Sequence, residues 1–160
     1  MRKLILAAFL FVSTITTNTY ADIKMGIILG FTGPIESLTP AMAASAELAF
    51  KEASDSGSLL GGKKISVERA DSTCVDSAAA TSAAEGLVSG GVIAIMGADC
   101  SGVTGAIAKN VAVPNGVVMI SPSATSPGLT DLNDNGYFFR TAPSDARGGQ
   151  ILADITKDRK

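Results

Sequence analysis

The sequence predicts an α/β fold in which a doubly wound parallel sheet carries helices on both faces. From residue 22 onward, short apolar runs alternate with longer segments of helical period, which is the pattern of successive βα units. Two of the short runs, VIAIM at 92–96 and VVMI at 117–120, are continuously apolar. Such runs are typical of central parallel strands that are covered on both faces. The length of 160 residues suits one compact domain.

Five strands and the first helix follow from this pattern. The apolar runs predict strands at 23–29, 65–68, 92–96, 117–120 and 137–140. The first helix is expected to start at Thr39-Pro40, because proline is favoured in the first helical turn. Glu47 and Lys51 are spaced to form an i,i+4 ion pair on this helix.

Three further helices are expected between and after the later strands. The second covers about 76–89, with Ala80, Ala83, Ala84 and Leu87 on one face, and Gly90-Gly91 ends it. Its alanines favour the helical state and allow close packing on a sheet. A third helix is expected from about 101–104 to before Pro114, and a fourth from about 144–146 onward.

The first 21 residues have the features of an export signal. Arg2 and Lys3 precede an apolar run at 4–12, and a short polar stretch then ends at Thr19-Tyr20-Ala21. The alternative is a membrane anchor, which is disfavoured because a spanning helix needs about 18 or more consecutive apolar residues. We therefore predict a signal peptide at 1–21, cleavage after Ala21, and a mature chain outside the cytoplasm.

Export decides what is expected of the two cysteines. In an oxidising compartment a disulfide between Cys74 and Cys100 is the default, and closing that loop would stabilise a domain of this size. The alternative is a pair of buried thiols that are not bonded.

Composition excludes several functional classes. The chain has no histidine, so neither a Ser-His-Asp triad nor a Cys-His pair can be assembled from it. The formal net charge is −2 and the Lys and Arg residues are scattered, which disfavours nucleic acid as a partner. Gly26, Gly30 and Gly33 follow GxxxGxxG and not the GxGxxG of dinucleotide sites. We therefore predict a protein that is not an enzyme, with no catalytic residue, no metal site and no cofactor.

Three loops are expected at the edge of the sheet where ligands bind in open α/β folds, beyond the carboxyl ends of the strands. They are GFTGPIESL at 30–38, GADCSG at 97–102 and SPSATSP at 121–127. Ser101 at a helix start, with the hydroxyl and N–H of Thr125, offers donors to a carboxylate, and the carbonyl of Ser123 offers an acceptor to an ammonium group. The alternative is that Ser101 and Thr125 only cap a helix and a turn.

Five segments occur in an order that points to a known family. They are DIKMGIILGFTGP, LLGGKKISVERAD, GADCSG, SPSATSP and YFFRTAPSD. With these segments and two matching cysteines, the chain resembles the type I periplasmic binding proteins of ABC transporters, within the branched-chain amino acid (leucine/isoleucine/valine) binding group. The resemblance covers nearly all of residues 22–150.

The resemblance implies two α/β lobes that close on a ligand. Residues 22–143 would form the N-terminal ligand-binding lobe, and 144–160 would begin the second lobe. Members of the group are much longer, so the chain is expected to be a truncated or partial open reading frame that lacks the second wall of the cleft.

The resemblance also implies a set of ligand-binding residues and one disulfide. The ligand carboxylate would meet Ser101 and Thr125, and its ammonium group would meet the carbonyl of Ser123 and the hydroxyl of Thr125. Leu38 lies about where members often place a larger aromatic or polar side chain. The pair Cys74–Cys100 matches a disulfide of the group. The implied ligand-binding residues are Leu38, Ser101, Ser123, Ala124 and Thr125.

The function implied is that of a periplasmic substrate-binding protein. Such a protein captures a small amino-acid-like ligand and delivers it to the membrane permease of an ABC transporter, and its full-length form is expected to be a monomer. The alternative is a ligand-sensing receptor module of the same fold, which would use the same pocket chemistry.

Overall fold

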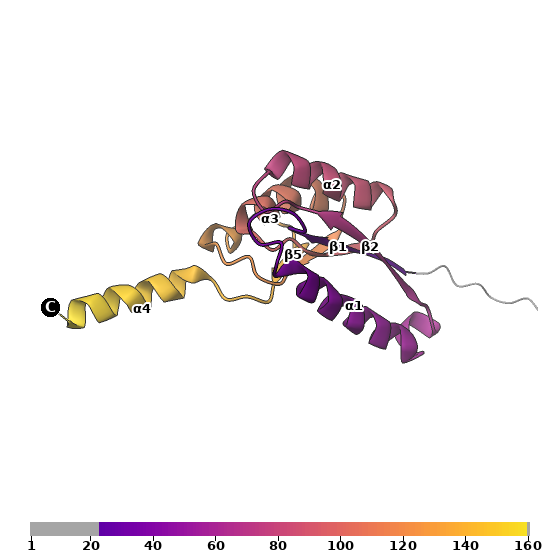
Figure 1. Cartoon of the computed structure of the whole chain (residues 1–160), viewed down its shortest axis with the longest axis horizontal. Helices are drawn as coiled ribbons and strands as arrows, with labels where there is room; N and C mark the ends of the chain where they lie inside the picture. The colour runs from indigo at the N-terminus through magenta and orange to yellow at the C-terminus, as the bar shows by residue number, and fades with distance from the viewer. Residues whose placement is uncertain (1–22, 160) are drawn as a thin grey trace, which may run out of the picture.

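The computed structural model describes residues 23–159, so the predicted signal peptide and its cleavage site after Ala21 lie outside the described residues. Strands and helices alternate along the chain, with only a short 3-10 turn at Pro127–Leu129 between the last two strands (Figure 1). The elements are β1 (Ile23–Leu29), α1 (Thr39–Asp55), β2 (Ile65–Asp71), α2 (Ser77–Ser89), β3 (Ala94–Gly97), α3 (Ser101–Ile107), β4 (Val118–Ser121), β5 (Phe138–Arg140) and α4 (Asp145–Asp158). A π-helical turn at Ala108–Ala112 continues α3.

The five strands form one parallel sheet in the order β2-β1-β3-β4-β5, which confirms the predicted fold class. The chain adds β2 on one side of β1 and β3 on the other, so the strand order reverses between β1 and β3. In doubly wound sheets this point of reversal opens the crevice that binds ligands, at the carboxyl ends of the strands.

Helices cover both faces of the sheet (Figure 1). On one face α2 and α3 pack against strand side chains such as Ile28, Ile95 and Met119. The small face of α2 is buried as predicted at Ala80 and Ala84, and this lets the helix approach the strands closely. On the other face Ala43 of α1 packs with Ile27 and Leu29 of β1 in a smaller core cluster.

The face that carries α1 is covered only in part. The register aligns Ile27, Met96, Ile120 and Phe139 in one row across β1, β3, β4 and β5. Ile27 is buried beneath α1, whereas Ile120 is 42% exposed and Phe139 is 51% exposed. Within residues 23–159, VVMI is therefore covered on one face and left bare on the other, because α1 reaches only the side chains nearest β1 and β2.

This exposed apolar row makes a testable prediction about association. We expect the chain to self-associate through this row, because a contiguous exposed apolar surface promotes association between protein molecules. The substitution Phe139→Thr should shift the protein toward monomer in sedimentation velocity, while changing the free energy of unfolding by about 1 kcal/mol or less. Val75→Thr is the control, because Val75 is more exposed (72%) but lies outside the row. Equal association of the Phe139→Thr and unsubstituted proteins would contradict the prediction.

The last helix, α4, extends away from the sheet (Figure 1). It begins at Asp145, where the Ser144 hydroxyl caps it by accepting from the N–H of Ala146. None of its residues is buried, and Ile151 and Leu152 are exposed on its apolar side. No helix among residues 23–159 combines the length and apolar character needed to cross a membrane.

Candidate functional site

The predicted site lies at the carboxyl edge of the sheet, around the reversal between β1 and β3. The structure brings the predicted loops at 97–102 and 121–127 together there with the start of the loop at 30–38. A fourth segment, at 72–76 after β2, joins them. Sequence reasoning included this segment only through Cys74.

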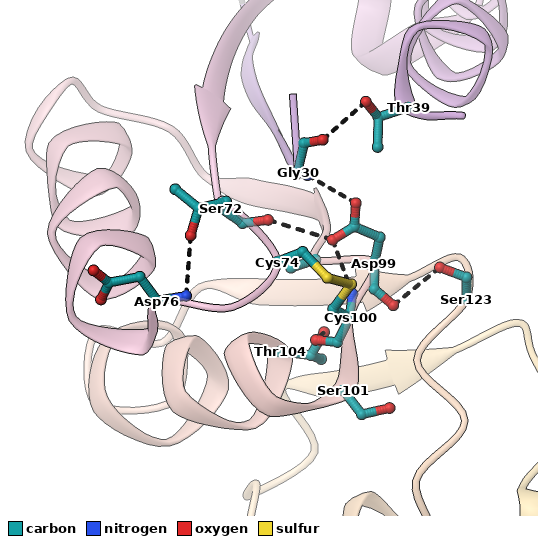
Figure 2. The surroundings of a disulfide bond; sticks show 12 residues. Gly30, Thr39, Ser72, Cys74, Asp76, Asp99, Cys100, Ser101, Thr104 and Ser123 are labelled. Atoms are coloured by element: carbon teal, nitrogen blue, oxygen red, sulfur yellow. Dashed lines mark hydrogen bonds between the residues drawn. A yellow bond between two sulfur atoms is a disulfide. The ribbon is translucent and has the colours of Figure 1, made fainter. Parts of the chain in front are cut away.

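The disulfide between Cys74 and Cys100 is present, as predicted, with its two Cα atoms 5.2 Å apart. It joins the segment after β2 to the residue that directly precedes α3 (Figure 2). Ser101, the first residue of α3, is thereby held one position from a covalent cross-link.

The hydroxyl of Ser101 organises the loop after β4. Its oxygen accepts hydrogen bonds from the N–H groups of Thr125 and Ser126, each 3.1 Å away. The N–H of Thr125, predicted to face a ligand, is therefore already bonded within the protein. The hydroxyl hydrogen of Ser101 stays available to donate to a ligand, because both of these bonds use its oxygen as acceptor.

Thr125 already holds a carboxylate in this structure. Its hydroxyl donates to the carboxylate of Asp145 at 2.7 Å, and the Asp145 N–H donates back to the Thr125 carbonyl at 3.0 Å. Asp145 is the first residue of α4 and is exposed, so this carboxylate can leave without uncovering the core.

The two residues before Thr125 have different surroundings. The Ser123 hydroxyl donates to the Asp99 carbonyl at 3.0 Å, and within residues 23–159 the Ser123 carbonyl accepts no hydrogen bond. Ala124 is fully buried, and its N–H donates to the Ser121 hydroxyl at 3.0 Å. The guanidinium of Arg140 donates to the carbonyls of both Ala124 and Ser126, which fixes the backbone of the loop from behind.

Leu38 stands apart from this hydrogen-bonded group. It directly precedes α1, its N–H donates to the carbonyl of Ile35 at 2.9 Å, and its side chain is 61% exposed. The structure therefore places Leu38 on the predicted loop but does not join it to the Ser101 and Thr125 group.

Sequence reasoning missed Asp99, whose buried carboxyl group lies between the loops (Figure 2). It accepts from the N–H of Gly30 at 2.7 Å and from the N–H of Cys100 at 2.8 Å. The signal that could have found it is its position, an acidic residue two places after a buried central strand. Among residues 23–159 no three His, Cys, Asp or Glu side chains converge as metal ligands would.

Comparison with known proteins identifies the family. A family model described as periplasmic binding protein matches residues 22–160. The chain belongs to the periplasmic binding protein family. It is 30% identical, over 166 residues, to the Leu/Ile/Val-binding protein homolog 3 of Brucella melitensis, a match that covers 100% of this chain and 44% of the relative. The chain thus spans less than half the length of this curated relative.

Solved structures agree with this family and confirm the predicted fold. A branched-chain amino acid transporter substrate-binding protein of Streptococcus pneumoniae, in complex with isoleucine, superposes with a TM-score of 0.70 and 34% identity, covering 78% of this chain and 35% of that one. An ABC transporter substrate-binding protein of Desulfitobacterium hafniense, in complex with leucine, has a TM-score of 0.70 and 28% identity, covering 87% and 39%. The resemblance seen in the sequence is confirmed.

In this periplasmic binding protein a second carboxylate, Asp71 at the end of β2, holds the loop after β1. The Thr32 hydroxyl donates to it at 2.5 Å and the Thr73 N–H at 2.8 Å. Burial acts to raise the pKa of Asp71, but hydrogen bonds from Thr32, Thr73 and Phe31 outweigh it and lower that pKa. The carboxylate therefore persists as an acceptor at neutral pH and keeps the loop tied to β2.

Proposed function

We propose that this chain forms the ligand-capturing lobe of an extracytoplasmic substrate-binding protein of an ABC transporter. The ligand would be a branched-chain amino acid or a related small molecule, delivered to a membrane permease. The observation that carries the proposal is the link between Ser101 and Thr125 at the carboxyl edge of the sheet. The Ser101 hydroxyl accepts from the N–H of Thr125, and the Thr125 hydroxyl already donates to a carboxylate. The names of the relatives, which refer to leucine, isoleucine and valine, support this ligand class.

The chemistry proposed for the site is recognition by hydrogen bonds alone. The ligand carboxylate would displace Asp145 from the Thr125 hydroxyl and accept a second hydrogen bond from Ser101. The free carbonyl of Ser123 would accept from the ammonium group. Ala124, which is buried, would anchor the loop after β4 to the core. Leu38 would contact the ligand side chain from the loop after β1. No step requires a catalytic residue, a metal or a cofactor.

The organisation proposed around this lobe follows the same family. Residues 1–21 would direct export to the periplasm, 22–143 would form the N-terminal lobe, and 144–160 would begin the second lobe. The exposed apolar side of α4 supports this division, because an amphipathic helix normally buries its apolar side against the core of the domain to which it belongs. The compared relatives are named as transport proteins, which favours delivery to a permease over a sensing receptor.

Export gives a first direct prediction. When the chain is expressed in a bacterium with a periplasm, we expect the soluble product in the periplasmic fraction to begin at Asp22. Intact-mass measurement of that fraction checks the new N-terminus. Replacement of Leu6 and Leu10 with arginine should abolish export, because the apolar run would be broken. Membrane-bound protein that still begins at Met1 would contradict the signal-peptide proposal.

Ligand binding tests the proposed function itself. We expect L-isoleucine to shift the amide NMR signals of Ser101 and Thr125 in the Asp22 to Lys160 protein, whereas isoleucine methyl ester, which lacks the carboxylate, should not. Ser101→Ala and Thr125→Ala should each weaken binding by about tenfold or more, since a hydrogen bond to a charged group contributes roughly 1.5 to 3 kcal/mol. Ser45→Ala is the control, because its exposed hydroxyl bonds only within α1. Equal shifts with ester and acid would refute a carboxylate site.

A further inference from the structure

The side chain of Asp99 links the segments that follow β1 and β3, the two strands between which the strand order reverses. Asp99 follows β3, and its Oδ2 accepts from the N–H of Gly30, the residue directly after β1. Its Oδ1 accepts from the N–H of Cys100 at 2.8 Å and from the hydroxyl of Ser72 at 3.3 Å. Only 4% of Asp99 is exposed. The carboxylate is therefore buried between the segments that follow β1 and β3, where the strand order reverses.

The main chain of Asp99 adds a fourth contact. Its carbonyl accepts the hydroxyl of Ser123, from the loop after β4 (Figure 2). One residue thus contacts the segments that follow β1, β2 and β4, and it leads directly into α3. Within residues 23–159 no Lys or Arg forms a salt bridge with Asp99, so its charge is balanced by hydrogen-bond donors alone. A buried carboxylate is costly if such donors are lost, which makes their arrangement a strong constraint.

We propose that Asp99 is a positioning residue that sets the placement of the ligand loops relative to one another. This inference rests on the proposed function, because that function gives the loops their role. Asp99 would act through its neighbours and not by touching the ligand. One route runs from its carboxylate through Cys100 to Ser101, whose hydroxyl holds the N–H groups of Thr125 and Ser126. The other runs from its carbonyl to Ser123.

The disulfide does not make this role redundant. Cys74 and Cys100 connect only the segment after β2 with the start of α3. The loop after β1 is connected to the start of α3 by the hydrogen bond from Gly30 to Asp99. Asparagine has the same shape but cannot replace this carboxylate. Its amide N–H₂ group only donates, so one of the donors that now bonds to Asp99 would lose its acceptor. The donors at Gly30 and Cys100 are backbone groups and cannot be exchanged.

The experiment is amide hydrogen exchange by NMR on the Asp22 to Lys160 protein and its Asp99→Asn variant, without ligand. The amides of Thr125 and Ser126 are the readout, since both donate to the Ser101 hydroxyl and not to Asp99, and the amides of Ile28 and Ile95 report on the core. We expect exchange at Thr125 and Ser126 to rise by about tenfold to a hundredfold relative to the core amides, the range set by losing a charge-assisted hydrogen bond.

Asp76→Ala is the matched control. Asp76 also accepts two backbone N–H bonds, from Ala78 and Ala79, but its carboxylate caps α2 and, within residues 23–159, forms no hydrogen bond with the loops that follow β1, β3 and β4. It should lower overall stability without changing exchange at Thr125 and Ser126 relative to the core. Exchange that rises equally at loop and core amides in Asp99→Asn, or does not rise at all, would overturn the positioning role.

Two additions keep the test decisive. If Asp99→Asn does not fold, Ser72→Ala removes one donor to the same carboxylate, and a selective rise of about threefold or more at Thr125 and Ser126 is then expected. No selective rise in Ser72→Ala would overturn the proposal in that case. Titration with L-isoleucine is a separate arm. Absence of binding by the unsubstituted protein would count against the proposed function, while the exchange data would still decide the role of Asp99.

Discussion

Replacing Cys74 and Cys100 together with alanine is expected to lower the free energy of unfolding by about 3 to 4 kcal/mol. The two cysteines are 26 positions apart, and cross-linking a loop of that size removes much of the freedom of the unfolded chain. Alanine is chosen because both cysteines are half-buried and a small apolar residue adds no unpaired polar group. Urea unfolding followed by circular dichroism, with the oxidised protein as reference, measures the difference.

Two observations would identify the cause of this loss. The unsubstituted protein unfolded in the presence of a reductant should be as unstable as the double variant, because both lack the same covalent link. The slope of the free energy against urea concentration should increase, because an unfolded chain without the cross-link exposes more surface. A loss below about 1 kcal/mol would contradict the prediction, because closing this loop would then restrict the unfolded chain far less than expected.

The order of strands and helices along the chain could be predicted from the sequence because short, mainly apolar runs alternate with segments of helical period. Strand ends were less predictable. The expected strand at 65–68 continues to Asp71, although Arg69 and Asp71 are polar, because β2 pairs in parallel with β1 as far as Leu29. β2 lies at the edge of the sheet, so its pairing with β1 and not its apolarity sets its length.

Local spacing also failed to predict a partner that comes from another element. Glu47 and Lys51 have the spacing of an i,i+4 pair, but Lys51 bonds to Asp55 and Glu47 bonds to Arg69 of β2. A guanidinium can bind both carboxylate oxygens at once, which an ammonium group cannot do with the same geometry. The hydrogen bond from Arg69 lowers the pKa of Glu47. Spacing rules describe one helix, and a neighbouring strand can supply a better partner.

The candidate site shows the same division between local and long-range information. Ser101 and Thr125 could be proposed because hydroxyl-rich loops follow predicted strands, and parallel strands align their carboxyl ends. The partners of Asp99 could not, because Gly30 is 69 positions away and Ser72 is 27 positions away. No periodicity in a single sequence shows that such distant groups converge. The bond between Thr125 and Asp145 was unpredictable for the same reason, since it depends on where α4 begins relative to the loop after β4.

The largest loss of stability from a single substitution is expected for Gly97→Ala. Gly97 ends β3 with a φ of +133°, a backbone conformation that residues with a side chain rarely adopt. An added Cβ would lie 2.0 Å from the carbonyl oxygen of Ile28, which is its register partner on β1. Backbone in a central strand cannot move aside as a flexible side chain can. Conformational strain and overpacking each cost roughly 1 to 3 kcal/mol, so a total loss of about 4 kcal/mol or more is expected.

Gly86→Ala is the matched control for this prediction, because it makes the same chemical change at an exposed position within α2. No atom lies within 4 Å of the Cβ that it would add, and alanine is the better helix former. Gly86→Ala should therefore raise the free energy of unfolding by about 0.5 to 1 kcal/mol. Urea unfolding of the two variants beside the unsubstituted protein measures both effects.

Because Gly97 is two residues from Asp99, Gly97→Ala should also speed amide hydrogen exchange at Thr125 and Ser126. A Gly97→Ala protein within about 1 kcal/mol of the unsubstituted one would show that β1 and β3 are less closely paired at this edge than the register of Ile28 with Gly97 requires.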